Sequence, residues 1–220
     1  MRSAKELQNA DHYGYSELYD IVALLRSEEG CPWDRAQDHH SIRKNLIEEA
    51  YEVAEALDRE DAVLLREELG DLLLQVFLHA DMEERAGREG MDGVFDGICR
   101  KLIFRHPHIF GGENAVTAKE ALAGWEERKK VEKGQKTLSQ DLNRVTRTLP
   151  GLMRAQKILK KAEKGGVDLT AYLSGDDPVS CLFALCLQAN QQEIDLEQAV
   201  YHRLEELIGE VKQNEVENEN

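Results

Sequence analysis

Apolar residues recur three and four positions apart along most of the chain, which is the spacing of an amphipathic α-helix. The first such stripe runs from Leu18 to Leu25 and predicts a helix, with Ser16 as its N-cap. The stretch that follows, GCPWDRAQDHH, interrupts the spacing with Gly30 and Pro32, so we expect a loop there.

Longer stripes predict three further helices, over about 41–58, 61–85 and 92–105. The segment HPHIFGG ends the last of these, because proline and paired glycines do not continue a helix. Thr117, followed three residues later by Glu120, forms the signature of a capping box for a helix that extends to about Lys133.

The remainder of the chain keeps the helical spacing after a polar, unpatterned stretch at 134–149. We expect Pro150 at the first position of the next helix, paired glycines at its end, and later helices near 178–191 and 196–212. No alternation is long enough to predict a strand. The predicted fold class is all-α, a helical bundle with short connections.

Composition narrows the classes of partner. The 220 residues carry 43 acidic and 28 basic side chains, a formal net charge of −15, which disfavours binding to a nucleic acid polymer. The four cysteines show no CxxC spacing and are expected to be reduced thiols. No apolar run approaches the roughly 18 residues of a membrane span, and no signal-peptide core is present, so we expect a cytoplasmic protein without a membrane partner.

Carboxylates are concentrated on the second and third predicted helices. Glu49 and Glu52 lie three apart on one, and Glu68 and Asp71 lie three apart on the other, so each pair shares a helix face. If the two helices are antiparallel neighbours, four carboxylates converge, with Glu48 at the edge. Such a group favours a hard cation such as Mg²⁺, Mn²⁺ or Ca²⁺ over Zn²⁺. The alternative is two ordinary solvated helix faces.

Several segments together resemble the MazG family. They are CPWDRAQDHHSIRKNLIEEAYEVAEAL, EELGDLLLQVFLHADM, KLIFRHPHIFGG and GWEERKK, in the family's order and at its spacings. The resemblance implies an all-α nucleoside triphosphate pyrophosphohydrolase fold completed by homodimerisation. It also implies that Mg²⁺, or Mn²⁺, is held by Glu49, Glu52, Glu68 and Asp71. The implied reaction converts nucleoside triphosphates to a monophosphate and pyrophosphate.

The same resemblance assigns groups that contact the nucleotide. Lys101 and Arg105 lie four apart on one predicted helix, and Trp125 and Lys129 lie four apart on another. Cationic side chains suit phosphate oxygens, and an indole stacks on bases without choosing among them. Trp33, in the CPWD segment, is a further candidate for contact with the nucleotide. By themselves, these residues would be taken as surface charges and as aromatic core anchors.

A mechanism follows from that assignment. Glu48 adjoins the expected metal ligands without being needed as one, so we predict that it orients or deprotonates the attacking water. Lys101 and Arg105, also placed in the catalytic set, and Lys129 would neutralise charge that develops on the pyrophosphate. The sequence has no GxxxxGK[ST] motif, which excludes a P-loop source of triphosphate chemistry.

The domain organisation follows the motifs. We predict a MazG-type catalytic domain at 1–135, a linker at 136–149, and a shortened, non-catalytic second repeat at 150–220. The last region resembles the later helices of a MazG repeat but lacks its own EExxE and ExxD motifs.

Two alternatives of different kinds stay open. One is a narrower pyrophosphohydrolase for dUTP or phosphoribosyl-ATP, which the CPWD and RHPHIF segments disfavour. The other is a non-catalytic regulator that responds to nucleotides or an alarmone, which the complete carboxylate set disfavours. The resemblance further implies a housecleaning role in the nucleotide pool, with canonical or non-canonical nucleotides as substrates.

Overall fold

The computed structural model describes residues 2–112, 114, 117–134 and 137–218. Every regular element within these ranges is a helix, which confirms the predicted all-α class. The chain divides into two compact units, Met1–Thr117 and Ala118–Asn220. Among the described residues, no helix combines the length and the apolar character that crossing a membrane requires.

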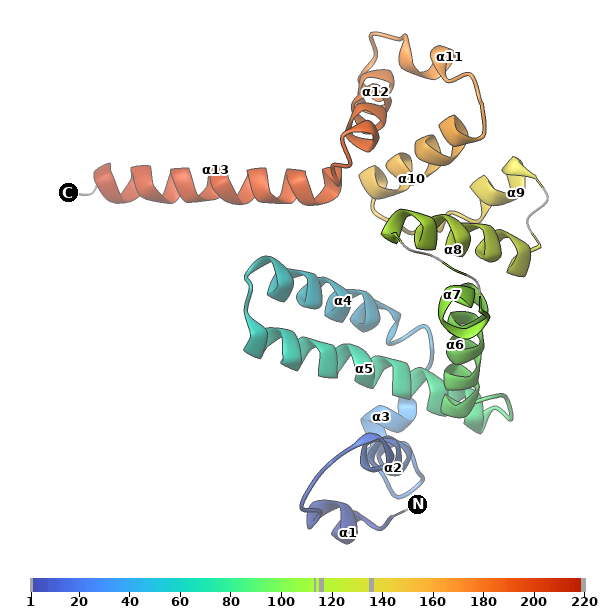
Figure 1. The fold of residues 1–220 in the computed structure, drawn as a ribbon. Coiled ribbons are helices and arrows are strands. Elements are labelled where there is room, and N and C mark those ends of the chain that lie inside the picture. The colour runs from blue at the N-terminus through green and yellow to red at the C-terminus, as the bar shows by residue number, and fades with distance from the viewer. Residues whose placement is uncertain (1, 113, 115–116, 135–136, 219–220) are drawn as a thin grey trace. The chain divides into compact units, whose positions relative to one another are not determined.

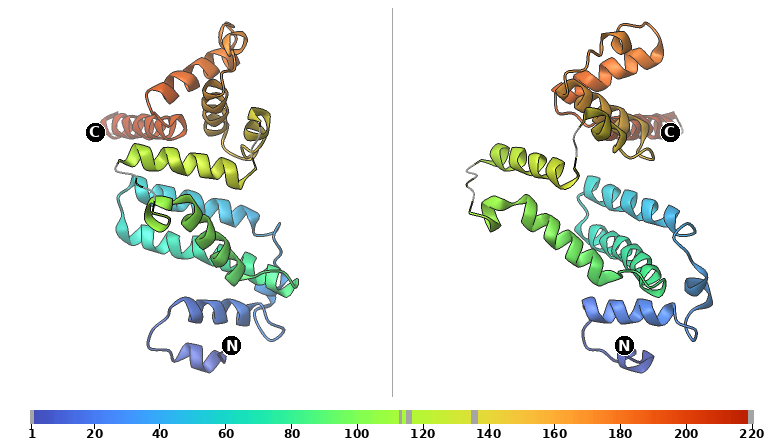
Figure 2. Two further views of the ribbon diagram at one scale, coloured as in Figure 1. Left: turned by 45° about the vertical axis from the view of Figure 1, so that its right-hand side comes forward. Right: turned by 90° about the vertical axis from the view of Figure 1, so that its right-hand side faces the viewer.

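The first unit contains seven helices (Figure 1): α1 (Ala4–Gln8), α2 (Tyr15–Leu25), α3 (Pro32–Ala36), α4 (Arg43–Asp58), α5 (Ala62–Arg85), α6 (Met91–Arg105) and α7 (Pro107–Phe110). Helices α4 and α5 form an antiparallel hairpin and lie side by side in every view (Figure 2).

A tight turn joins the two arms of this hairpin. Glu60 adopts a positive φ of 53°, the left-handed conformation that reverses the chain after α4. Asp61 then caps α5, because its Oδ1 accepts hydrogen bonds from the backbone N–H groups of Val63 at 2.9 Å and Leu64 at 3.1 Å. Local backbone chemistry thus fixes how α4 faces α5.

The core of the first unit lies where α2 and the start of α4 pack against the C-terminal half of α5. It consists of Val22, Ile42, Phe77, Leu78, Ala80, Met82 and Met91. The N-terminal half of α5, which carries Glu68 and Asp71, contributes none of these residues. The hairpin therefore extends beyond the core and leaves its distal end at the surface.

A buried arginine holds the α3 segment in place. Arg26, only 7% exposed, donates from Nε to Asp81 Oδ2 on α5 at 2.8 Å. Its other nitrogens donate to the backbone carbonyls of Asp34 and Gln37. A buried guanidinium with a full set of partners ties α2, α3 and α5 together.

The second unit contains six helices: α8 (Ala118–Glu132), α9 (Leu138–Asn143), α10 (Gly151–Lys164), α11 (Thr170–Leu173), α12 (Pro178–Gln191) and α13 (Leu196–Asn218). The α10–α12 pair encloses buried Leu159, Ala162, Cys186 and Ala189. Buried Gln156 joins this pair to α13, since its side chain donates to the carbonyl of Ile194 at 2.8 Å and accepts from the N–H of Leu196 at 3.0 Å.

The long predicted helices are confirmed, and the differences lie at their ends. Helix α2 begins at Tyr15, so Ser16 is inside it and the Ser16 cap was wrong. Instead, the Glu17 carboxylate accepts from the Gly14 N–H at 2.9 Å. Pro150 is the N-cap of α10 and not its first residue, and α13 continues past the expected end at 212 to Asn218.

Short helices were missed where loops were expected. The GCPWDRAQDHH segment contains α3, the HPHIF segment contains α7, and the polar linker contains α9. The predicted boundaries at 135 and 149 separate a catalytic domain, a linker and a non-catalytic repeat, and this division of function stays a prediction. By contacts, α8 is grouped with the second unit.

Candidate metal centre

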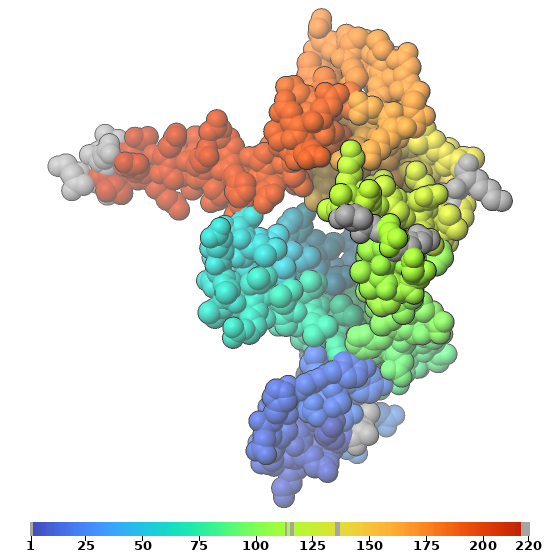
Figure 3. All heavy atoms as spheres, in the orientation of Figure 1, coloured from blue at the N-terminus to red at the C-terminus, as the bar shows by residue number. Residues whose placement is uncertain are grey.

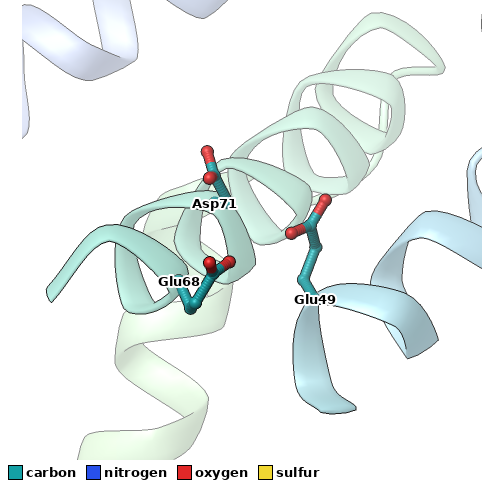
Figure 4. A group of neighbouring side chains, drawn as sticks. All are labelled: Glu49, Glu68 and Asp71. Atoms are coloured by element: carbon teal, nitrogen blue, oxygen red, sulfur yellow. The ribbon is translucent and has the colours of Figure 1, made fainter. Parts of the chain in front are cut away.

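Three of the predicted carboxylates meet at the distal part of the α4–α5 hairpin (Figure 4). Glu49 comes from α4, and Glu68 and Asp71 come from α5, one helical turn apart. Each offers one oxygen, and these three oxygens all lie within 4.8 Å of one another. The antiparallel pairing expected from the sequence therefore does bring carboxylates of both helices together.

The electrostatics of this cluster are unfavourable without a cation. Burial raises the pKa of Glu49, and the neighbouring carboxylates of Glu52, Asp71 and Glu68 raise it further. Partial desolvation also raises the pKa of Glu68, with additional contributions from the negative charges around it. Each shift means that the ionised form is destabilised in the folded chain.

Glu52 and Glu48 stand apart from the three-residue group. Glu52 is exposed, and it lies near enough to Glu49 to contribute to the raised pKa of that residue. Glu48 is exposed on α4. The predicted roles of both residues, as ligand and as water-orienting group, stay predictions.

The donor set fits a hard divalent cation. All the converging atoms are carboxylate oxygens, and no His or Cys belongs to the group. Oxygen-only sites suit Mg²⁺, Mn²⁺ or Ca²⁺, whereas Zn²⁺ sites usually contain nitrogen or sulfur ligands. The raised pKa values of Glu49 and Glu68 point the same way, because a bound cation would favour the ionised forms.

The predicted phosphate-binding pair of the first unit lies on α6. Lys101 is exposed, and Arg105, one turn further on, is buried with 6% of its surface exposed. Trp33 lies on the short helix α3 and is 59% exposed, so its indole is open to contact. The structure places these side chains in the same unit as the carboxylates.

The other predicted pair lies on α8, in the second unit. The Lys129 Nζ stands over the Trp125 ring, 4.8 Å from its centroid, as a cation–π contact. The spacing of four residues thus does bring these two side chains together. The predicted substrate groups are divided between the two units, and their joint action stays a prediction.

A histidine network beside the hairpin was not foreseen. His39 precedes α4, and its Nδ1 lies 2.8 Å from Nδ1 of His79 on α5. Its Nε2 lies 2.8 Å from Glu83 Oε1, and Arg88 forks onto the Glu83 carboxylate with two 2.6 Å bonds. The His rings are parallel within 3° with centroids 5.1 Å apart, which together with the short Nδ1–Nδ1 distance describes an in-plane hydrogen bond.

The protonation states of this network follow when His39 is neutral. The ionised Glu83 then accepts from His39 Nε2–H, His39 Nδ1 is the acceptor, and His79 Nδ1–H is the donor. His79 Nε2 then carries a lone pair, is buried, and has no hydrogen-bond partner among the described residues. The four-residue spacing of His79 and Glu83 on one helix was the signal available in the sequence.

The α4–α5 hairpin with its clustered carboxylates lies within a domain that comparisons with known proteins recognise. Residues 37–110 match the model of the MazG nucleotide pyrophosphohydrolase domain. A nucleoside triphosphate pyrophosphohydrolase of Escherichia coli is 44% identical over 154 residues, 70% of this chain and 59% of that protein. The chain thus spans less than two thirds of the length of that relative.

Two further relatives are covered more completely. An uncharacterised 26.1 kDa protein of Streptomyces cacaoi is 34% identical over 188 residues, 84% of this chain and 77% of that protein. The crystal structure of a mazG-related protein from Thermotoga maritima shares 31% identity, covering 53% of this chain and 99% of that one, with a TM-score of 0.45. The chain belongs to the MazG family.

Proposed function

We propose that this protein hydrolyses nucleoside triphosphates, ribo- or deoxyribo-, to a nucleoside monophosphate and pyrophosphate with the help of Mg²⁺ or Mn²⁺. It acts on the cytoplasmic nucleotide pool, in which removal of non-canonical nucleotides is the expected housecleaning role. The observation that carries the proposal is the carboxylate group of Glu49, Glu68 and Asp71 on a hairpin of the matched domain.

Glu49, Glu68 and Asp71, joined by Glu52, would hold the divalent cation. Bound there, such a cation neutralises phosphate oxygens and lowers the pKa of water. An acidic chain with a net charge of −15 repels a free triphosphate, so a mediating cation also explains how the substrate approaches.

The remaining work belongs to side chains that touch the substrate. Glu48, exposed next to Glu49, orients the attacking water or accepts its proton. Lys101 and Arg105 on α6, with Lys129 on α8, offset the negative charge that develops on the departing pyrophosphate. Trp125 and Trp33 supply stacking surfaces that tolerate different bases.

The active form is a homodimer. Helix α6 presents an exposed apolar stripe of Val94, Ile98 and Leu102, which are 44%, 39% and 45% exposed. Helix α13, whose length stands clear of the rest of its own unit (Figure 3), presents Leu204 and Leu207 at 52% and 54%. Stripes of this kind on a water-soluble enzyme indicate surfaces that a partner covers.

The decisive assay follows the products of hydrolysis. Purified protein with Mg²⁺ is incubated with a panel of ribo- and deoxyribonucleoside triphosphates, and pyrophosphate and orthophosphate are quantified separately. We expect pyrophosphate and the monophosphate in equal amounts, from several bases, and full loss of activity in EDTA. Orthophosphate as the product, or activity that survives EDTA, would contradict the proposal.

A further inference from the structure

The second unit contains a pocket of about 480 Å³ between α8, α9 and α10. Eight of its lining side chains are Lys or Arg and only two are carboxylates, in a chain where acidic residues outnumber basic ones by 43 to 28. Helix α8 contributes Lys129, Lys130 and Lys133. The lining of the pocket is therefore positively charged, whereas the chain as a whole is negatively charged.

The remaining cations come from two other segments. Helix α10 contributes Lys157, Lys160, Lys161 and Lys164, which follow one another at intervals of three, one and three residues along a single face. Arg144 is added from the end of α9, and its Nη2 donates to the Lys133 carbonyl at 2.6 Å. Cations from three segments therefore converge on one cavity.

Two of the cations are compensated within the pocket. Lys161 Nζ lies 2.6 Å from Asp141 Oδ1, and Lys164 Nζ lies 3.8 Å from Glu126 Oε2. Both pocket carboxylates are thereby used. Among its described lining residues, the pocket has no other carboxylate that could neutralise its remaining basic side chains.

Four ammonium groups remain without compensation. Among the described residues, the side chains of Lys130, Lys133, Lys157 and Lys160 form no ion pair and no hydrogen bond, although all four line the same pocket. Like charges held near one another repel, so this arrangement is more stable with an anion bound between them. Lysine supplies three donors and suits the dispersed negative charge of phosphate oxygens.

The pocket also has apolar walls. Leu138, Leu149 and Val145 line it, and Val145 is buried at 7% exposure. The uncompensated lysines are exposed at the rim of the pocket, and the apolar side chains form its walls. A volume of about 480 Å³ is within the roughly 300–1,000 Å³ of small-molecule sites.

We propose that this pocket binds a small anion with two or more linked phosphate groups and that binding needs no divalent cation. Its cations take the place that Mg²⁺ takes at a carboxylate site, since they meet the phosphate charge directly. None of the clustered carboxylates lines the pocket, so this site does not depend on the proposed hydrolytic function. Lys129 is the one residue assigned to both.

The test is a binding measurement on the full-length protein in EDTA at fixed ionic strength. Inorganic triphosphate, pyrophosphate, ATP and adenosine are titrated separately by calorimetry. We expect saturable binding of inorganic triphosphate at one site per chain, weakened by added salt, and no binding of adenosine. Equal affinities for ATP and inorganic triphosphate would mean recognition of phosphates alone, and tighter binding of ATP would mean that the apolar wall contacts the nucleoside.

The variant Lys157→Glu/Lys160→Glu should lower the affinity for inorganic triphosphate at least tenfold. The matched control is Lys119→Glu/Lys212→Glu, which makes the same charge change in the same unit at lysines that do not line the pocket. If the pocket variant fails to keep its helical circular dichroism, Lys157→Gln/Lys160→Gln is used in its place.

Three results would overturn the proposal. They are the absence of saturable triphosphate binding in EDTA, an equal loss in the pocket and control variants, and a preference for a single-stranded oligonucleotide over every small anion. The variant Asp71→Asn should bind inorganic triphosphate as the unmodified protein does. Because the assay contains no divalent cation and measures no turnover, its outcome is independent of whether the protein proves to be a pyrophosphohydrolase.

Discussion

At the scale of single residues, the carboxylate cluster lowers the stability of the metal-free chain at neutral pH. Glu49 and Glu68 have raised pKa values because their ionised forms lose water contact and repel neighbouring charges. A group whose pKa is raised on folding binds more protons in the folded chain, so its contribution to stability is lost as pH rises through the raised pKa. At neutral pH the metal-free hairpin therefore carries an electrostatic strain that a cation relieves.

Replacement of Asp71 with Asn tests this balance. The change keeps the side chain's shape and removes one charge, so we expect turnover to fall by more than tenfold, a barrier increase above about 1.4 kcal/mol. In EDTA at pH 7, the thermal midpoint should be unchanged or higher, because one source of repulsion is gone. Steady-state pyrophosphate release and thermal denaturation measure the two effects.

The matched control is Asp92→Asn, the same chemical change at an exposed position in the first turn of α6. It should leave turnover unchanged. An Asp71→Asn protein that keeps more than a tenth of the activity would remove Asp71 from the set of metal ligands.

At the scale of elements, the His39–His79–Glu83 network holds the segment before α4 against α5. Burial lowers the pKa of His79 below the ordinary 6.5, and the charge of His39 lowers it further, against a smaller opposite effect of Glu83. Hydrogen bonds from Arg88 and His39 lower the pKa of Glu83 to about 2. The lowered pKa of His79 favours its neutral form, and the lowered pKa of Glu83 favours its ionised form.

The pH dependence of stability follows from these shifts. Between the lowered pKa of His79 and 6.5, the unfolded chain binds more protons at this residue, so stability falls as pH decreases through that window. Glu83 adds a second loss as pH falls from 4.5 toward about 2. Because the shifts of Glu49 and Glu68 have the opposite sign, the informative quantity is the difference between two proteins. As pH falls from 7 to 5, the urea midpoint of the unmodified protein should decrease relative to that of His79→Gln.

His12→Gln serves as the control for this experiment, because His12 is exposed in the first unit. Its midpoint should follow the unmodified protein across the same range. A His79→Gln profile parallel to that of the unmodified protein would show that His79 does not titrate between folded and unfolded states as inferred.

The sequence predicted the elements that repeat a pattern and missed those that do not. Helices α4, α5, α6, α10 and α12 have apolar stripes over three or more turns, and their bounds came within a few residues. Helices α1, α3, α7, α9 and α11 have four to six residues, too few to show a period. Their signals were local: Pro32 and Pro107 at the first helical position, and the capping box of Thr137 with Gln140.

The candidate sites divide in the same way. Glu49, Glu68 and Asp71 were found because they lie on consecutive helices, where spacing alone fixes the shared face. The basic pocket was not found, because its lysines come from both α8 and α10 and are separated by a stretch of unpatterned sequence. Lysines at such a distance converge only through packing, which periodicity does not report.

At the scale of the whole molecule, many large apolar side chains are exposed, and the stripe on α6 is the clearest case. We expect the protein to be a homodimer that covers this stripe. The change Ile98→Arg places a charge at its centre, so dimerisation should weaken markedly. Light scattering coupled to size exclusion should then give a mass near the 25.0 kDa of one chain, against twice that value for the unmodified protein.

Arg100→Gln is the appropriate control, because Arg100 is exposed on the same helix and pairs with Asp96 one turn away. Its mass should remain that of the dimer. An unmodified protein that elutes as a single chain would show that α6 is covered in some other way or not at all.

The α4–α5 hairpin also bears on the order in which the chain folds. Glu49 is joined to Glu68 and Asp71 by the rest of α4, a tight turn and the first turns of α5. This stretch of chain is short, so closing the loop that joins the three carboxylates has a small entropic cost. Contacts of such short range form early, before distant segments meet. We therefore expect the carboxylates to come together while most of the chain is still unfolded. Without a cation, their mutual repulsion would oppose formation of this part of the hairpin. A divalent cation present at that moment would act on the folding nucleus as well as on the finished protein.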